Sequence, residues 1–256
     1  MTTTRHNGSL YTSFQNNIAT IEFGHPASNS FPSELLERLT KELNSIAKND
    51  IISVIILKSE GEKAFCAGAS FDELVAISNL EEGKKFFAGF ANVINAMRTC
   101  GKLIIGRVQG KTVGGGVGLA AACDYVLATE NAAIKLSEFT IGIGPFVIEP
   151  AVKRKIGVAG LSELTLDATN WKNAYWAKEK GLYAKVFETI KELDEEVEIF
   201  ALKLASYNPS ALAEMKKVLW ENTQNWDDLL AERAAISGEL VLSEFTKNAL
   251  AKFSKK

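Results

Sequence analysis

Two glycine-rich segments constrain this chain more than any other feature of its sequence. Residues 61–74 (GEKAFCAGASFDEL) and 114–116 (GGG) each follow a probable strand and precede a probable helix. Glycine permits tight turns and close approach, so such a turn can point free backbone N–H groups at an anion. Two turns of this kind in one domain can hold one oxygen from two sides, as stabilisation of an enolate or a tetrahedral oxyanion requires. The sequence therefore predicts an enzyme rather than a scaffold.

Strand-like and helix-like runs alternate through most of the chain. Strands are predicted at residues 9–14, 18–23, 51–58, 103–108, 125–128 and 133–136. Helices are predicted from Pro32 onward and at residues 81–97 and 117–122. From Phe146 the pattern becomes mainly helical, with helices at 192–206, 210–222, 226–238 and 242–253. We therefore predict an α/β core over residues 1–195 and a helical C-terminal region over residues 196–256.

Composition and charge argue against several classes of function. The 256 residues carry a formal net charge of -2, which gives no electrostatic reason to bind nucleic acid or a membrane surface. The N-terminus lacks an apolar signal core, and no apolar run reaches the roughly 18–20 residues of a spanning helix. The three cysteines show no CxxC spacing, and the two histidines have no ligand-like spacing. We therefore expect a reduced, cytoplasmic protein without a metal site.

Five segments form an ordered set of motifs. They are residues 63–69 (KAFCAGA), 109–124 (QGKTVGGGVGLAAACD), 137–145 (SEFTIGIGP), 155–157 (KIG) and 177–182 (AKEKGL). Together they resemble the signatures of the enoyl-CoA hydratase/isomerase family, also called the crotonase family, over almost the whole chain. The resemblance implies an α/β fold, namely a crotonase-like spiral of ββα units with a helical C-terminal trimerisation region. It also implies homotrimers, often paired into hexamers, and an acyl-CoA thioester substrate.

The same resemblance assigns roles to individual residues. It implies that the backbone N–H groups of Ala69 and Gly115 form an oxyanion hole for the thioester enolate. It makes Glu138 the acid/base, and an apolar acyl pocket around this carboxylate would raise its pKa toward neutrality. It also places three residues around the substrate, which are Ala67, Gly68 and Gly114. No metal or redox cofactor is expected, because CoA arrives as part of the substrate.

Two departures from the family pattern bear on the reaction. Gly118 stands where the hydratases of the family carry a second glutamate that helps to hold water. The segment PFVIEP at 145–150 replaces a glycine-rich stretch, and Glu149 within it is a candidate second carboxylate. One carboxylate suits 3,2-enoyl-CoA isomerisation better than water addition. The alternatives are a hydratase with a rearranged water site, an acyl-CoA decarboxylase and a non-catalytic acyl-CoA-binding protein.

Overall fold

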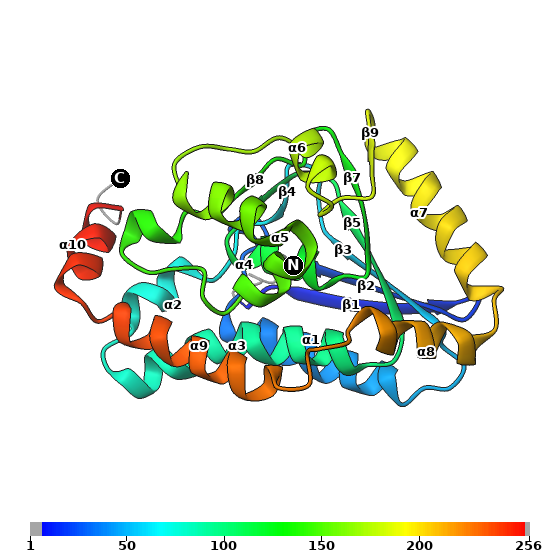
Figure 1. The fold of residues 1–256 in the computed structure, drawn as a ribbon, viewed down its shortest axis with the longest axis horizontal. Helices are drawn as coiled ribbons and strands as arrows, with labels where there is room; N and C mark the ends of the chain where they lie inside the picture. Colours follow the sequence, from blue (N-terminus) through cyan, green and yellow to red (C-terminus); the bar gives the residue numbers. More distant parts are fainter. Residues whose placement is uncertain (1–6, 254–256) are drawn as a thin grey trace, which may run out of the picture.

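The computed structural model describes residues 7–253, which form two β-sheets surrounded by helices (Figure 1). The strands are β1 (Ser9–Gln15), β2 (Ile18–Gly24), β3 (Val54–Ser59), β4 (Ala64–Cys66), β5 (Leu103–Val108), β6 (Lys111–Val113), β7 (Tyr125–Thr129), β8 (Ile134–Lys135) and β9 (Lys185–Phe187). The larger sheet has the order β1-β2-β3-β5-β7-β9, and the smaller one has the order β4-β6-β8. All pairings are parallel except the β1–β2 hairpin, whose turn residues Asn16 and Asn17 have φ values of 52° and 62°.

Helices lie between the strands and after the last strand along the chain. They are α1 (Ser33–Ala47), α2 (Phe71–Ala76), α3 (Leu80–Thr99), α4 (Gly115–Ala122), the 3-10 helix η1 (Glu138–Ile141), α5 (Glu149–Leu166), α6 (Ala174–Glu179), α7 (Ile190–Ala205), α8 (Pro209–Leu219), α9 (Trp226–Leu240) and α10 (Glu244–Phe253). Three times in succession, one strand of the larger sheet is followed by one strand of the smaller sheet and then by a helix. These repeats are β3-β4-α2, β5-β6-α4 and β7-β8-η1, and they confirm the predicted ββα architecture.

The two faces of the larger sheet pack against different helices. Ile55 and Leu57 of β3 belong to the main core, which also contains the buried residues of α1 and α3. Val54 and Ile56 of the same strand point to the other face and pack with Val197 of α7. In Figure 1, α7 runs along the side of this sheet, while α1, α3 and α9 lie side by side. Because both faces are covered, β3 and β5 read as continuous apolar runs in the sequence.

The structure adds the short strands β4 and β6, which were not predicted, and corrects the predicted elements at two further places. Strand β3 begins at Val54 and not at residue 51, because Asn49 accepts the Ile51 N–H and ends α1 in a turn that leaves Ile51 exposed. The prediction of a mainly helical chain after Phe146 missed β9, a three-residue strand that pairs with β7. The domain boundary predicted after residue 195 falls inside α7, and the division into two regions stays a prediction. Within residues 7–253, no helix is long and apolar enough to span a membrane.

Candidate active site

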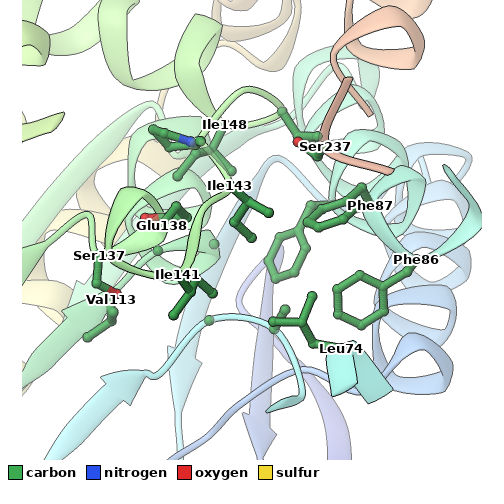
Figure 2. Close-up of a pocket in the computed structure, with 18 of the residues that line it drawn as sticks. Leu74, Phe86, Phe87, Val113, Ser137, Glu138, Ile141, Ile143, Ile148 and Ser237 are labelled. Carbon is green, nitrogen blue, oxygen red and sulfur yellow. The ribbon is translucent and has the colours of Figure 1, made fainter. Parts of the chain in front are cut away.

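A cavity of about 200 Å³ opens where the strands of the smaller sheet end. Figure 2 shows its walls, which come from the turn after β4, the turn between β6 and α4, η1, the helices α2, α3 and α9, and the segment before α5. Most of its side chains are apolar, including Leu74, Phe86, Phe87, Phe90, Ile141, Ile143 and Ile148. Among the described residues that line it, Glu138 is the one ionisable side chain. The cavity can therefore hold an apolar chain next to a single acid/base group.

The two glycine-rich turns meet at this cavity. Gly68 has a φ of 90°, and a Cβ atom placed on it would lie 3.1 Å from the Val113 carbonyl oxygen and 3.4 Å from the Gly115 nitrogen. A larger residue at position 68 would push the turns apart. Gly114 also has a positive φ, of 54°, which turns the chain from β6 directly into α4. Glycine is needed at these two positions because of both the backbone conformation and the close approach.

Two backbone amides of these turns are available to a ligand. On either side of Ala69, the Gly68 N–H donates to Cys66 Sγ and the Ser70 N–H donates to the Phe31 carbonyl oxygen. Within residues 7–253, the N–H groups of Ala69 and Gly115 have no hydrogen-bond acceptor. Gly115 is the first residue of α4, so the partial positive end of this buried helix lies at the cavity. The two amides therefore provide the donors that an oxyanion hole requires.

The carboxylate of Glu138 is placed next to these turns. A Cβ atom on Gly114 would lie 3.0 Å from Glu138 Oε1, and Figure 2 shows Glu138 on the cavity wall. The residue as a whole is half-buried, but its Oε2 atom is fully buried and has no hydrogen-bond partner among the described residues. Burial raises the pKa of Glu138 to about 7, because the apolar surroundings disfavour the charged form. Such a group can both accept and return a proton near neutral pH.

Next to Gly118, the space for a side chain is filled by the aliphatic Ile148. A Cβ atom on Gly118 would lie 2.3 Å from Cγ2 and 2.6 Å from Cβ of Ile148. Position 118 is on α4 and is completely buried, so a longer side chain there has no alternative direction. Gly118 and Ile148 are thus complementary, since any side chain at position 118 would clash with Ile148.

The structure places the predicted site residues as follows. Ala67, Gly68, Ala69, Gly114, Gly115 and Glu138 all line the cavity. Glu149 is not among the lining residues; it begins α5 and forms an ion pair of 3.6 Å with Lys153, while its neighbour Ile148 faces the cavity. This position of Glu149 does not support its role as a second carboxylate. The sequence analysis missed Ser237, which α9 brings to the cavity from a distant part of the chain.

Other polar residues near the motifs have structural roles. Asp124, at the end of α4, accepts hydrogen bonds of 2.7 Å from the Ile104 N–H, Lys216 Nζ and Trp220 Nε1. It thereby joins α4, β5 and α8. Ser70 caps α2 by accepting the Glu73 N–H at 3.4 Å. Burial raises the pKa of the Cys66 thiol to about 12, which disfavours the reactive thiolate at neutral pH.

Comparison with known proteins agrees with this geometry. A family model described as enoyl-CoA hydratase/isomerase matches residues 13–252. The chain is 30% identical over 242 residues to the short-chain-enoyl-CoA hydratase of Clostridium acetobutylicum, covering 93% of this chain and 92% of that protein. It is 30% identical over 206 residues to the peroxisomal Delta(3,5)-Delta(2,4)-dienoyl-CoA isomerase of Arabidopsis thaliana, covering 75% and 72%. The crystal structure of an enoyl-CoA hydratase from Bacillus halodurans shares the fold, with a TM-score of 0.88 at 22% identity over 95% of this chain and 99% of that one.

Proposed function

The chain belongs to the enoyl-CoA hydratase/isomerase family. Within this family, we propose that it converts a 3-enoyl-CoA thioester, with its double bond between C3 and C4, into the 2-enoyl ester, with its double bond between C2 and C3. The observation that carries the proposal is that one carboxylate, Glu138, is found among the described residues that line the cavity. Glu138 lies beside the oxyanion turns, and Ile148 occupies the space that a side chain at position 118 would need. An isomerase needs one group that moves one proton, and the cavity supplies one such group.

The first step is activation of the thioester. Its carbonyl oxygen accepts hydrogen bonds from the N–H groups of Ala69 and Gly115, which have no acceptor within residues 7–253. These donors become more favourable as negative charge grows on the oxygen, so they lower the energy of the enolate more than that of the substrate. Loss of one such donor typically costs about 10²–10³ in rate. The hole thereby acidifies the hydrogen on C2.

The second step is transfer of one proton. The Glu138 carboxylate removes a proton from C2 of a 3-enoyl ester, and the electron pair of that C–H bond enters a dienolate held at the thioester oxygen. The protonated Glu138 then gives the proton to C4, while the double bond forms between C2 and C3. Atoms and electrons balance without water or an oxidant. A pKa of about 7 suits this role, because both protonation states of Glu138 are then within easy reach.

Hydration is the second candidate, and the names of several relatives favour it. The relatives named above include a short-chain-enoyl-CoA hydratase as well as a dienoyl-CoA isomerase. Water addition to a 2-enoyl ester would require Glu138 to activate water without a neighbouring carboxylate. Decarboxylation of an acyl-CoA and binding without turnover use the same oxyanion hole and are the remaining outcomes of the test.

The experiment compares wild-type protein with E138Q and with E149Q as a matched control. E149Q changes a carboxylate that does not line the cavity. Isomerisation of a 3-enoyl-CoA should fall by about 10²–10⁴ in E138Q and stay near wild type in E149Q, because general acid–base catalysis contributes about that factor. Equal turnover of E138Q and wild type would refute the proposal. Binding of the ester without turnover by the wild type would favour the non-catalytic alternative.

We also propose that the enzyme needs no metal or redox cofactor.

We propose further that it forms homotrimers. The C-terminal helices leave several large apolar side chains exposed, among them Ile199 and Leu202 on α7 and Met215, Val218 and Leu219 on α8. A subunit contact would cover such side chains. Light scattering of the purified protein should give three or six times the chain mass. A monomer would contradict the proposal.

A further inference from the structure

The turn that carries Ala69 is held by residues 28–33, the segment that leads from β2 into α1. The Phe31 N–H donates to the Gly68 carbonyl oxygen at 2.8 Å. The Ser70 N–H donates to the Phe31 carbonyl oxygen at 3.0 Å. The two peptides on either side of Ala69 are therefore both bound to one residue of the neighbouring segment.

The first of these bonds fixes the direction of the oxyanion donor. The Gly68 carbonyl and the Ala69 N–H belong to one planar trans peptide, in which the C=O and N–H bonds point in opposite directions. Because the carbonyl is bound to Phe31, the N–H cannot turn without breaking that bond. The aim of the Ala69 N–H thus depends on where Phe31 lies relative to the turn.

Glu73 of α2 joins the two segments at a further point. Its Oε2 atom accepts hydrogen bonds from the Ser33 N–H at 2.9 Å and from the Ser33 hydroxyl at 2.6 Å. Ser33 is the first residue of α1, and its N-cap is Pro32, whose side chain cannot accept a hydrogen bond. Glu73 therefore caps α1 from another helix, and its carboxylate lies at the partial positive end of α1.

These contacts close a ring just after the turn. Ser70 binds the Phe31 carbonyl oxygen through its N–H, and its Oγ accepts the Glu73 N–H at 3.4 Å. Glu73 binds Ser33 through its side chain, and Pro32, with its fixed φ, connects Ser33 back to Phe31. Removing the Glu73 carboxylate opens this ring, so that α2 can shift relative to α1 and carry Ser70 with it.

We propose that Glu73 is a positioning residue for the reaction, which holds α1 and α2 at the spacing that aims the Ala69 N–H at the thioester oxygen. Glu73 is not among the described residues that line the cavity, whereas its neighbours Phe71 and Leu74 are, and Figure 2 shows Leu74 on the wall. This inference rests on the proposed function, because it takes the Ala69 amide as an oxyanion donor. A cap that served α1 alone would affect stability and leave the reaction unchanged.

The test compares wild type with E73A, E73Q and the matched control E192A. Glu192 also caps a helix with its carboxylate, because it accepts the Thr189 N–H at 3.0 Å at the start of α7, and it is not among the described lining residues either. E73A removes the acceptor for Ser33, whereas E73Q keeps an amide oxygen that can take its place. Thermal unfolding gives the melting temperature of each protein.

Two rates are measured for each protein. One is isomerisation of a 3-enoyl-CoA, with kcat and KM determined separately. The other is uptake of deuterium from D₂O at C2 of a saturated acyl-CoA, in which the base removes a proton and a deuteron returns. The second rate requires the enolate and its oxyanion hole, but no movement of a double bond.

E73A should lose about 10- to 100-fold in kcat and in deuterium uptake with a smaller change in KM, because a misplaced donor weakens binding of the enolate more than that of the ester. E73Q should keep most of the wild-type rates. E192A should keep them fully, although its melting temperature should fall about as far as that of E73A, since each variant removes one helix cap. Wild-type rates in E73A, or an equal loss of rate in E192A, would overturn the proposal.

The two rates also separate this inference from the proposed function. Deuterium uptake that falls in E73A, with isomerisation by none of the proteins, would support the positioning role of Glu73 and contradict the proposed isomerase. Normal isomerisation by E73A would contradict the positioning role and leave the isomerase in place. A wild type that neither isomerised the ester nor took up deuterium would overturn both.

Discussion

The close approach of Ile148 to Gly118 leaves no room for a side chain at position 118, and it can be tested by a double-mutant cycle. In G118A the new Cβ atom would lie 2.3 Å from Ile148 Cγ2, a distance at which one of the two groups must move. Helix α4 cannot easily withdraw, because a Cβ atom on Gly116 would already lie 2.7 Å from Cys66. The strain must therefore be taken up by Ile148 and by the segment that precedes α5.

The expected magnitude follows from two opposing effects. Overpacking a buried site costs about 1–3 kcal/mol in the free energy of unfolding. Replacing a helical glycine by alanine returns roughly 0.5–1 kcal/mol. The second effect does not depend on residue 148, so it cancels in a cycle made of wild type, G118A, I148A and G118A/I148A. The coupling free energy between the two positions should therefore be about 1–3 kcal/mol, with G118A less harmful when residue 148 is alanine.

The assay is urea unfolding of the four proteins, followed by circular dichroism under conditions where unfolding is reversible. The m-values of the four proteins should agree, so that the free energies can be compared. Additive effects, within about 0.5 kcal/mol, would refute the reasoning that Ile148 excludes a side chain at position 118. A coupled pair would justify a second step, in which G118E/I148A is tested for a gain of hydratase activity over G118E alone.

Three further predictions concern buried ionisable groups. Burial raises the pKa of Glu138 from 4.5 to about 7, so the folded state binds this proton more tightly than the unfolded state does. As the pH rises from 4.5 to 7, wild type should therefore lose up to about 3 kcal/mol in the free energy of unfolding relative to E138Q. Parallel pH profiles of the unfolding free energy of the two proteins would contradict this. K216M should destabilise by about 3–5 kcal/mol, because it removes the cation that pairs directly with the buried Asp124 carboxylate and leaves the more distant Lys155 and Arg154, whereas K217M on the surface should cost less than about 1 kcal/mol. Similar losses of the two variants in denaturant unfolding would contradict this. Burial raises the pKa of Cys66 to about 12, so this thiol should resist a thiol reagent at pH 8 in the folded protein and react after unfolding. Rapid labelling of Cys66 in the native protein would contradict this.

Much of the fold could be predicted because local signals and tertiary contacts agree. The Asn16-Asn17 turn, the apolar run of β5 and the helical spacing in α1 and α3 each specify one structure, and the elements follow them closely. Strand β9 could not be found in this way. Its three residues show no period, and their conformation depends on pairing with β7, about 60 positions earlier in the chain.

The residues of the candidate site also fall into two groups, those that a local sequence signal indicates and those that depend on contacts between distant parts of the chain. Ala69, Gly115 and Glu138 belong to motifs with a local signal, since glycine-rich turns and the order of the segments point to them. Ser237 carries no local signal, because a serine in a helix is usually a surface residue, and the close crossing of α3 and α9 is what brings it to the cavity. The role of Ile148 was equally hidden, because it depends on a contact with Gly118, 30 positions away in sequence.

The most direct test of the account is the mass of the product that the wild-type enzyme forms from a 2-enoyl-CoA and from its 3-enoyl isomer, with E138Q measured in parallel. We expect wild type to interconvert the two esters at unchanged mass and E138Q to lose this activity. A product heavier by one water, formed by wild type from the 2-enoyl ester and lost in E138Q, would contradict it. Such a result would show that Glu138 activates water in a cavity without a second carboxylate.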